Sequence, residues 1–275
     1  MTKTALVTGA SAGIGEAIAL RLLADGYRVF AAARRIPLMV DLNVAGAEVL
    51  TLDVTDEASM VAAVATVEAR AGRLDVLVNN AGYGSYGALE DVPLDEGRRQ
   101  FEVNLFGLAR MTQLALPIMR RQGGGTIINI TSIGGKMYEP LGAWYHATKF
   151  AVEGMSDCLR MEVEPLGLKV IVIEPGAIKT EWSGIARDQL LKYSGEGPYA
   201  EGAQRHARLL ANAGTSAMAS SPSVVANTVS RALKARRPRT RYATGGGAGF
   251  ILLMRRLLSD RQFDGFMRLV LRSFG

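Results

Sequence analysis

The sequence predicts an α/β protein, in which a single domain is built on a doubly wound, parallel sheet of about seven strands with helices on both faces. Over the first two thirds of the chain, short apolar runs alternate with helical stretches of ten or more residues. The runs are apolar at nearly every position, as in strands that helices cover on both faces. Such sheets bind ligands beyond the carboxyl ends of their strands, where the strand order reverses.

The apolar runs predict strands at residues 4–8, 27–33, 48–52, 74–79, 126–131 and 168–173, and a short further strand near 239–243. We expect helices at 13–25, 56–71, 96–121, 143–165 and 223–235. Residues 181–222 interrupt the periodicity with glycine, serine and proline, which predicts a mobile lid over the site with some helix inside it. Because neither a repeat nor a linker divides the chain, we expect residues 1–275 to form one domain.

Composition narrows the class of protein. Of the 275 residues, 48% are hydrophobic and 21% are charged, which is ordinary for a globular domain. Cys158 is the only cysteine, so an internal disulfide is excluded and we expect a reducing, cytoplasmic setting. The net charge of +6 favours acidic ligands in general, but the sequence has no nucleic-acid-binding module, and two histidines predict no metal site. The sequence contains no run of 18 apolar residues, so we expect no membrane-spanning helix.

The first expected strand ends in the turn Thr8-Gly9-Ala10-Ser11-Ala12-Gly13-Ile14-Gly15, which opens the first helix. Gly9, Gly13 and Gly15 lack a Cβ, so a pyrophosphate can approach the backbone closely, and the helix N-terminus adds free N–H groups. The spacing G-x-x-x-G-x-G differs from the common dinucleotide fingerprint G-x-G-x-x-G. The turn predicts a dinucleotide phosphate site, with an ordinary tight turn as the alternative.

The end of the second expected strand bears on the choice of cofactor. An acidic residue there would hold the ribose hydroxyls of NAD, but the chain has Arg34 and Arg35. Guanidinium groups suit a 2′-phosphate, so we expect NADP(H) to be preferred and leave NAD(H) open. The alternative is that both arginines are solvated surface charge. Asp53, at the end of the third strand, is placed to meet the adenine, or else it caps the next helix.

A tyrosine and a lysine four residues apart predict a proton-transfer pair. Tyr145 and Lys149 lie in Tyr-His-Ala-Thr-Lys, and positions i and i+4 share one face of a helix. A neighbouring ammonium lowers the pKa of a phenol from about 10, so the phenol can exchange a proton with a substrate oxygen. Ser132 precedes the pair by thirteen residues, at the end of the fifth strand.

Together these motifs resemble the short-chain dehydrogenase/reductase family, and most closely its hydroxysteroid and retinol dehydrogenase-like branch. The resemblance rests on the glycine turn, Asn79-Asn80-Ala81-Gly82, the set Asn104, Ser132, Tyr145 and Lys149, and Pro175-Gly176 with Thr180. It implies a Rossmann-type sheet and catalytic roles for Asn104, Ser132, Tyr145 and Lys149. The implied cofactor-binding residues are Gly9, Ser11, Gly13, Ile14, Gly15, Arg34, Arg35, Asp53, Val54, Asn80, Ala81, Gly82, Tyr145, Lys149, Pro175, Gly176, Ile178 and Thr180.

The resemblance also assigns roles. Tyr145 would be the general acid in reduction and the base in oxidation, and Lys149 would lower its pKa and hold the nicotinamide ribose. Ser132 would hydrogen-bond the substrate carbonyl, and Asn104 would support a water chain to Lys149. The alternatives are that Ser132 caps a helix and that Asn104 is a satisfied polar group within one. Family members that prefer NADP often carry a basic residue in the glycine turn, where this chain has Ser11-Ala12, so more of the recognition falls on Arg34.

The expected substrate is a bulky, hydrophobic alcohol or ketone, because the segments around the site are mainly apolar. The expected pocket walls are Ile133, Met137, Tyr138, Leu141, Trp144, Trp182, Ile185, Leu190 and Leu191, with packing of the lid as the alternative for half of them. We expect an enzyme that oxidises alcohols or reduces ketones. The second interpretation is an NADP-binding sensor or scaffold without turnover. All four catalytic positions are filled, which argues against it.

Residues 248–274 form an amphipathic helical extension that mixes apolar residues with five arginines. Such a segment packs on its own domain or on a sister subunit, and the alternative is peripheral contact with an anionic membrane. The resemblance implies a homodimer or homotetramer formed through the helices near 96–121 and 143–165.

Overall fold

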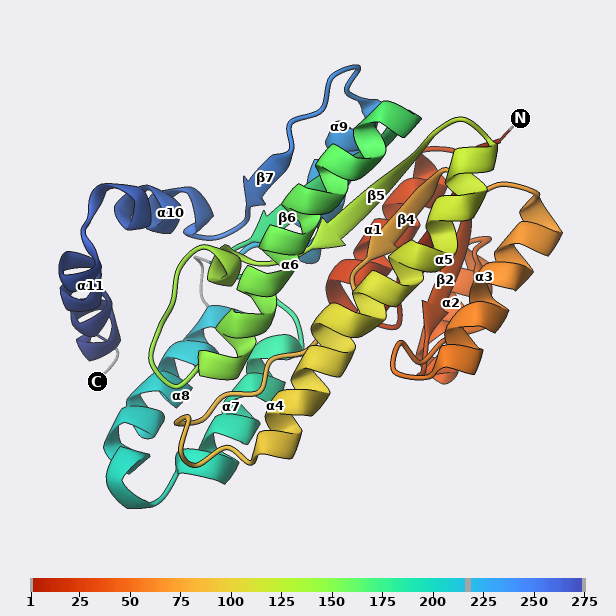
Figure 1. Ribbon diagram of the computed structural model, residues 1–275. Helices are drawn as coiled ribbons and strands as arrows, with labels where there is room; N and C mark the ends of the chain where they lie inside the picture. The colour runs from red at the N-terminus through yellow and green to blue at the C-terminus, as the bar shows by residue number, and fades with distance from the viewer. Residues whose placement is uncertain (1, 216–218, 274–275) are drawn as a thin grey trace.

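A seven-stranded, fully parallel sheet forms the centre of the computed structural model, which describes residues 2–215 and 219–273 (Figure 1). Its strands are β1 (Thr4–Thr8), β2 (Arg28–Ala33), β3 (Glu48–Thr51), β4 (Val76–Asn79), β5 (Gly125–Ile130), β6 (Leu168–Pro175) and β7 (Arg241–Thr244). They lie in the order β3-β2-β1-β4-β5-β6-β7, so the order reverses between β1 and β4. The predicted α/β, doubly wound fold is confirmed, and its ligand position lies at this reversal.

Helices cover both faces of the sheet because alternate strand residues face opposite sides and both sets are apolar. Val7 packs with Ile18 and Val229 on the face covered by α1 (Gly13–Ala24) and α9 (Pro222–Lys234). Leu6 packs with Met111 on the other face, covered by α3 (Glu57–Ala71), α5 (Gly107–Arg121) and α6 (Ala143–Val163). The two cores hold the sheet in place, and its strand ends carry the site.

The long helix predicted at 96–121 contains a π-helical turn. It runs as α4 (Leu94–Phe101), η2 (Glu102–Phe106) and α5, and the π turn is η2. A π turn widens a helix by one residue and often lies at a functional site. Here it contains Asn104.

Two segments are more helical than the sequence predicted. The first follows β2, where η1 (Ile36–Met39) and α2 (Val40–Val44) occupy residues with no predicted element. The second is the expected lid at 181–222, in which α7 (Trp182–Ser194), η5 (Gly197–Tyr199) and α8 (Ala200–Thr215) fill most of the described residues. Residues 216–218 of that stretch lie outside the described residues. Gly195 lies between α7 and η5, and a Cβ on Gly184 or Gly202 would meet nothing within 4 Å, so these glycines do not break the helices.

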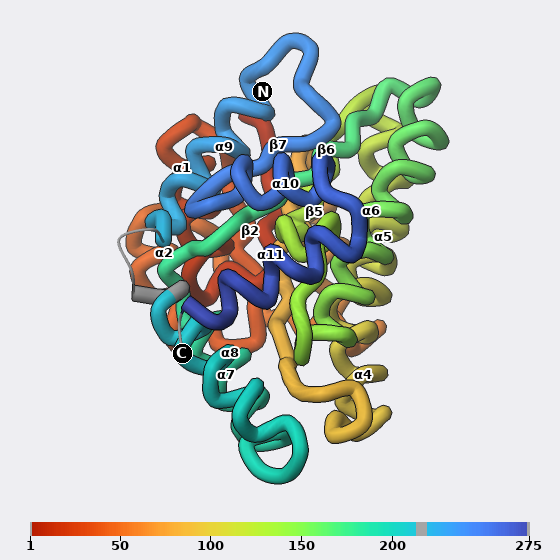
Figure 2. Tube along the Cα trace, turned by 90° about the vertical axis from the view of Figure 1, so that its left-hand side faces the viewer, coloured from red at the N-terminus to blue at the C-terminus, as the bar shows by residue number. Residues whose placement is uncertain are grey.

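The C-terminal extension forms two helices, α10 (Ala248–Leu257) and α11 (Asp260–Arg272), with a break at Leu258–Ser259. Ser259 and Gln262 form a reciprocal capping box that starts α11. The inner face of the pair packs on the protein's own domain, where Phe263 and Met267 are buried beside Met137. Figure 2 shows α11 crossing the front of the molecule between α8 and α6. Phe274, the last residue of the predicted extension, lies outside the described residues.

No helix in residues 2–215 or 219–273 is long and apolar enough to cross a membrane.

Candidate active site

The glycine turn between β1 and α1 is narrow because other backbone lies against it. Gly9 and Gly13 have positive φ angles of 64° and 62°. A Cβ on Gly15 would lie 2.3 Å from the Gly9 carbonyl oxygen and 2.5 Å from the Asn80 Nδ2 atom. A Cβ on Gly9 would lie 2.8 Å from the Ala81 Cα atom. Only glycine fits this cradle at the helix N-terminus, as expected for a backbone that must approach a pyrophosphate.

Asn80 joins the turn after β4 to the glycine turn. Its Nδ2 atom donates to the Thr8 carbonyl oxygen at 3.0 Å and to the Gly9 carbonyl oxygen at 3.1 Å. The Asn80 and Ala81 amides both donate to the Thr8 hydroxyl, at 3.0 and 3.1 Å. The two strand ends on either side of the strand-order reversal therefore form one hydrogen-bonded unit. Gly82 continues it, since a Cβ there would lie 3.1 Å from Asn104 Oδ1.

The two arginines after β2 lie beside the turn. Arg35 donates from Nε to the Ser11 hydroxyl at 3.4 Å and pairs with Glu181 at 3.2 Å, just before α7. Arg34 is mostly exposed, and its guanidinium lies 3.9 Å from the Asp53 carboxylate. Both cations therefore face the region beyond the strand ends, and Arg35 is nearer the turn than its neighbour.

Asp53 does not cap α3. Its Oδ1 atom accepts from the Thr55 amide at 3.0 Å and from the Thr55 hydroxyl at 2.8 Å. Asp56 is the capping residue, because its side chain accepts from the Ala58 amide at 3.0 Å. The helix-cap interpretation of Asp53 is wrong, and its carboxylate remains at the sheet edge. Val54, which follows, is buried against Gly107 at the start of α5.

The four residues expected to be catalytic meet at the ends of β4 and β5. Tyr145 and Lys149 lie on one face of α6, with the Lys149 ammonium 6.0 Å from the tyrosine ring centroid. That ammonium donates to the Ile130 carbonyl oxygen at 3.1 Å. Asn104 donates at 3.1 Å to the hydroxyl of Thr148, which in turn donates to the Tyr145 carbonyl oxygen at 2.8 Å.

Asn104 is a satisfied polar group and Ser132 caps a helix, as the alternative interpretations of the two residues have it. The Asn104 side chain accepts from the Tyr83 amide at 3.0 Å and donates to the Tyr83 carbonyl oxygen at 2.9 Å, so it is satisfied within the π turn. Ser132 caps η3 (Ile133–Gly135), because its hydroxyl accepts from the Gly134 amide at 3.0 Å. These bonds fix each side chain in place and do not remove it from the site.

Burial dominates the titration of the pair. It raises the pKa of Tyr145 to about 12, although the Ser132 hydroxyl acts in the opposite direction. Burial also lowers the pKa of Lys149 to about 8, against the attraction of Glu153. At neutral pH the phenol therefore keeps its proton and the lysine is mostly charged.

The segment after β6 lies across the turn from Asn80. Pro175 ends β6 and its carbonyl oxygen lies 3.4 Å from the Ser132 hydroxyl, which donates to it. A Cβ on Gly176 would lie 2.3 Å from the Gly246 carbonyl oxygen. Ile178 is buried, and the Thr180 methyl group lies 3.0 Å from the position of a Gly13 Cβ. The segment thus lies against the glycine turn at Gly13.

The predicted pocket walls are only partly correct. Trp144 faces away from the site and packs edge-on against Phe101 of α4, so that prediction is wrong. Trp182 instead covers Tyr145, with ring centroids 5.0 Å apart. Leu190 is fully buried in the packing of α7, and Met137 packs under α11.

Sequence reasoning missed a buried polar cluster behind Tyr145. Glu139 accepts from the Tyr86 hydroxyl at 2.8 Å and lies 3.5 Å from His206 and 3.9 Å from His146. The Tyr86 ring lies 5.7 Å from that of Tyr145. These residues come from separate loops and from α6 and α8, so no local spacing in the sequence indicates that they meet.

The glycine turn at the α1 N-terminus, Arg34 and Arg35 beside it, and the Tyr145–Lys149 pair fit a bound nicotinamide dinucleotide, because the turn has no room for side chains and leaves its backbone open to a pyrophosphate. In the part of the chain that the structure describes, no cluster of histidine, cysteine, aspartate and glutamate could hold a metal ion. The fold and this arrangement define a dinucleotide-dependent oxidoreductase that acts on alcohols or carbonyls.

The chain belongs to the short-chain dehydrogenase/reductase family, since the family model described as short chain dehydrogenase matches residues 3–190. It is 37% identical over 252 residues to an oxidoreductase, BOA17, of Botryotinia fuckeliana, covering 90% of each chain. It is 42% identical over 175 residues to a 3-ketodihydrosphingosine reductase of Bacteroides thetaiotaomicron, covering 64% of each.

Solved structures agree. A short-chain dehydrogenase from Streptomyces avermitilis superposes with a TM-score of 0.83 at 38% identity, covering 99% of this chain and 98% of that one. An actinorhodin polyketide ketoreductase with NADPH has a TM-score of 0.76 at 32% identity, covering 90% and 97%. A short-chain enzyme from Burkholderia phymatum in complex with NAD has a TM-score of 0.81 at 25% identity, covering 97% and 95%. A nicotinamide cofactor is thus supported, and both of its forms occur among the neighbours.

Proposed function

We propose that the protein is an NADP(H)-dependent reductase of a hydrophobic ketone, of steroid-, retinoid- or lipid-like character. The observation that carries the proposal is the meeting of Tyr145, Ser132 and Lys149, with the Lys149 ammonium 6.0 Å from the Tyr145 ring centroid and the Ser132 hydroxyl beside the phenol. Burial raises the pKa of Tyr145, so its phenol is protonated at neutral pH and can donate the proton that reduction of a carbonyl needs. The bound cofactor supplies the hydride.

Each residue of the site has a part in this proposal. Ser132 orients the substrate carbonyl, and Tyr145 donates the proton to its oxygen. Lys149 stabilises the phenolate that remains and contacts the nicotinamide ribose. Asn104, held by Tyr83 and Thr148, fixes the start of α6 beside the proton path.

The preference for NADP(H) is proposed on the two cations beside the turn. Arg35 lies against Ser11 of the turn, and Arg34 is exposed next to Asp53. A 2′-phosphate between them would form charge-assisted hydrogen bonds that a ribose hydroxyl cannot. We expect the Arg34→Ala, Arg35→Ala double variant to lose at least tenfold in NADPH affinity and to bind NADH unchanged. Equal losses for both cofactors would contradict the preference.

The hydrophobic substrate is proposed on the surroundings of Tyr145. Its ring packs in one apolar cluster with Tyr86, Trp182 and Leu190. The similarity to a 3-ketodihydrosphingosine reductase supports a lipid-like carbonyl.

The test is NADPH oxidation by the purified protein with a panel of steroid, retinoid, long-chain aliphatic and quinone carbonyls. Tyr145→Phe should abolish turnover and keep cofactor affinity within about twofold. Tyr27→Phe, a half-buried tyrosine far from the site, is the matched control and should keep full activity. Cofactor binding without turnover of any carbonyl would favour the sensor interpretation instead.

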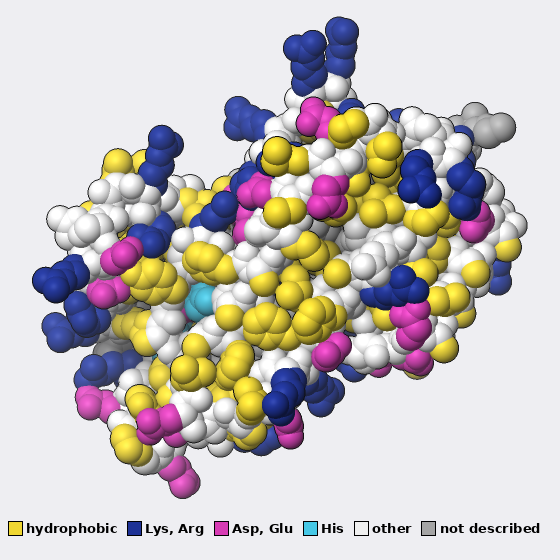
Figure 3. All heavy atoms as spheres, in the orientation of Figure 1, with side chains coloured by type: hydrophobic (Ala, Val, Ile, Leu, Met, Phe, Trp, Pro, Cys, Tyr) yellow, Lys and Arg dark blue, Asp and Glu magenta, His cyan; other side chains and the backbone are white. Residues whose placement is uncertain are grey.

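Self-association is proposed through the exposed apolar face of α4, α5 and α6. Leu94, Phe106, Phe150 and Met161 are each 44–71% exposed there. Figure 3 shows apolar side chains gathered over this face. A dimer or tetramer would cover them. Sedimentation of the wild type against Phe106→Glu tests this, and two monomeric proteins would contradict it.

Peripheral membrane contact is a separate proposal for the outer face of α10 and α11. Phe250, Leu253, Leu257 and Leu269 are 49–68% exposed there, beside exposed Arg256 and Arg261. That combination suits an anionic lipid surface. Cosedimentation with anionic but not neutral vesicles is the expected result.

A further inference from the structure

We infer that a cavity of about 1000 Å³ between α8, α11 and residues 138–143 binds the far end of the substrate, and that this end is an anionic group on an apolar chain. The inference rests on the proposed function, and it assigns a polarity to the substrate that the site around Tyr145 does not.

The cavity has the size and lining of a ligand site. Pockets that enclose small molecules measure about 300–1000 Å³ and are mainly apolar. Leu89, Pro140, Leu141, Pro198 and Leu271 supply most of the apolar wall here. Figure 3 shows the surface hollowed beside the C-terminal helices, with a histidine in the hollow. An apolar chain therefore finds a continuous surface.

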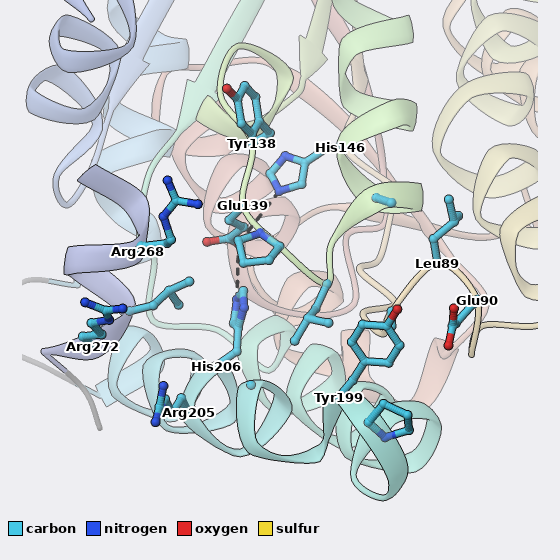
Figure 4. Close-up of a pocket in the computed structure, with 17 residues that line it drawn as sticks. Leu89, Glu90, Tyr138, Glu139, His146, Tyr199, Arg205, His206, Arg268 and Arg272 are labelled. Atoms are coloured by element: carbon cyan, nitrogen blue, oxygen red, sulfur yellow. Dashed lines mark ion pairs between the residues drawn. The ribbon is translucent and has the colours of Figure 1, made fainter. Parts of the chain in front are cut away.

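Positive charge gathers at one end of the cavity. Arg205, Arg268 and Arg272 line this end, on α8 and α11 (Figure 4). Arg205 pairs with Glu201 on its own helix. Arg268 and Arg272 form no ion pair with any residue in 2–215 or 219–273. Glu90 lines the opposite end, next to Tyr199. Two unpaired guanidinium groups at one end of an apolar cavity are suited to a carboxylate, sulfonate or phosphate group.

Glu139, the other carboxylate that lines the cavity, is already compensated. Glu139 is bonded to Tyr86 and flanked by His206 and His146. Although burial alone would raise it, these neighbours hold the pKa of Glu139 down to about 2. An ammonium group on a ligand would thus have to pass Arg268 and Arg272 to reach Glu139, whose charge is already compensated by its neighbours. The charge distribution favours an anion over a cation.

His206 supplies an unmet hydrogen-bonding group inside the cavity. Its side chain is 0% exposed, its Nε2 atom lies 3.5 Å from the Glu139 carboxylate, and its Nδ1 atom has no hydrogen-bond partner among the described residues. A polar group of a ligand at Nδ1 would supply the missing hydrogen bond.

The cavity lies directly behind Tyr145. The Tyr86 ring stands between them, with its centroid 5.7 Å from that of Tyr145 and 5.4 Å from that of His206. Leu141, which forms the rim, has a φ of 64°, a conformation that non-glycine residues adopt at a cost and that often marks functional sites. Its carbonyl oxygen accepts from the Gly87 amide at 2.7 Å. In this proposal the apolar chain passes the Tyr86 ring at the rim formed by Leu141, which packs with both Tyr86 and Tyr145.

Direct binding tests the inference without turnover. Isothermal titration calorimetry of decanoate, decanol and decyltrimethylammonium, each below its critical micelle concentration, compares head groups on one chain length. We expect decanoate to bind at least tenfold more tightly than the other two. The Arg268→Gln, Arg272→Gln double variant should lose this preference and keep its affinity for decanol. Arg256→Gln, Arg261→Gln, on α10 and α11 but outside the cavity, is the matched control and should keep the preference.

Three results would overturn the anion assignment. They are equal affinities of the wild type for decanoate and decanol, an equal loss in the control variant, and tightest binding of the ammonium compound.

Steady-state kinetics then tests whether the bound end belongs to the substrate. In the wild type, a long-chain keto acid should be reduced with at least tenfold higher kcat/KM than its methyl ester, because its KM is lower. In the Arg268→Gln, Arg272→Gln variant, the acid and the ester should have the same kcat/KM. Equal kinetics for acid and ester would remove the cavity from the substrate site. If decanoate binds as expected but no ketone is reduced, the proposed function fails while the anion site stands.

Discussion

Replacing Gly15 by alanine tests the link between the glycine turn and cofactor binding. The new Cβ would lie 2.3 Å from the Gly9 carbonyl oxygen, which is backbone, and 2.5 Å from Asn80 Nδ2. Neither contact is tolerable, so α1 must shift or Asn80 must leave its two bonds to Thr8 and Gly9. Overpacking costs about 1–3 kcal/mol and each lost hydrogen bond about 1 kcal/mol. We therefore expect a loss of about 3 kcal/mol in the free energy of unfolding.

The assay combines urea unfolding with NADPH binding. The Gly15→Ala variant should unfold at lower urea concentration and bind NADPH at least tenfold more weakly, because the pyrophosphate cradle is displaced. Gly265→Ala is the matched control. Its Cβ would meet nothing within 4 Å in the middle of α11, so alanine should stabilise the protein by up to about 1 kcal/mol. A Gly15→Ala protein with unchanged stability and NADPH affinity would refute this account of the turn.

Three further predictions concern stability. Arg241 pairs with the buried Glu153 and with Asp157, so Arg241→Gln should cost about 3 kcal/mol in urea unfolding; a loss below 1 kcal/mol would contradict the pairing. Burial and the nearby Glu153 raise the pKa of Glu174 from 4.5 to about 7 in the folded protein. Ionisation of Glu174 therefore opposes folding, and the free energy of unfolding should fall as pH rises from about 4.5 to 7. Glu174→Gln should remove that slope and add up to about 3 kcal/mol at pH 8, and a slope that persists would place its origin elsewhere. Asp56→Ala removes the cap of α3 and should cost about 1 kcal/mol by thermal unfolding, whereas Asp53→Ala should cost less.

The sequence predicted those parts of the site whose residues lie close together along the chain. The glycine turn and the Tyr145–Lys149 spacing each lie within one strand end or one helix turn, so local pattern is enough to find them. The strands were predicted within a few residues because their apolar runs are covered on both faces. The short α2 was missed since five residues show no period.

The cavity depends on contacts between distant segments. His206 lies in a stretch whose glycines suggested irregular chain, and Arg268 lies in an extension whose amphipathic pattern fits packing or membranes equally well. Trp144 was misplaced for a related reason: it precedes Tyr145 by one residue, and neighbouring residues of a helix point about 100° apart. Only the packed structure shows which face each one takes.

The π turn at Glu102–Phe106 also constrains how the length of this helix can change. The extra residue lets Asn104 reach Tyr83 and Thr148 while Met111 and Ala115 remain in the core. Deleting one residue between the two sets would turn the π turn into a regular α-helix and remove the wider turn that holds Asn104 against Tyr83 and Thr148. Insertions and deletions in this helix should therefore be tolerated only beyond Arg121, where the exposed Gly123 and the half-buried Gly124 lead into β5.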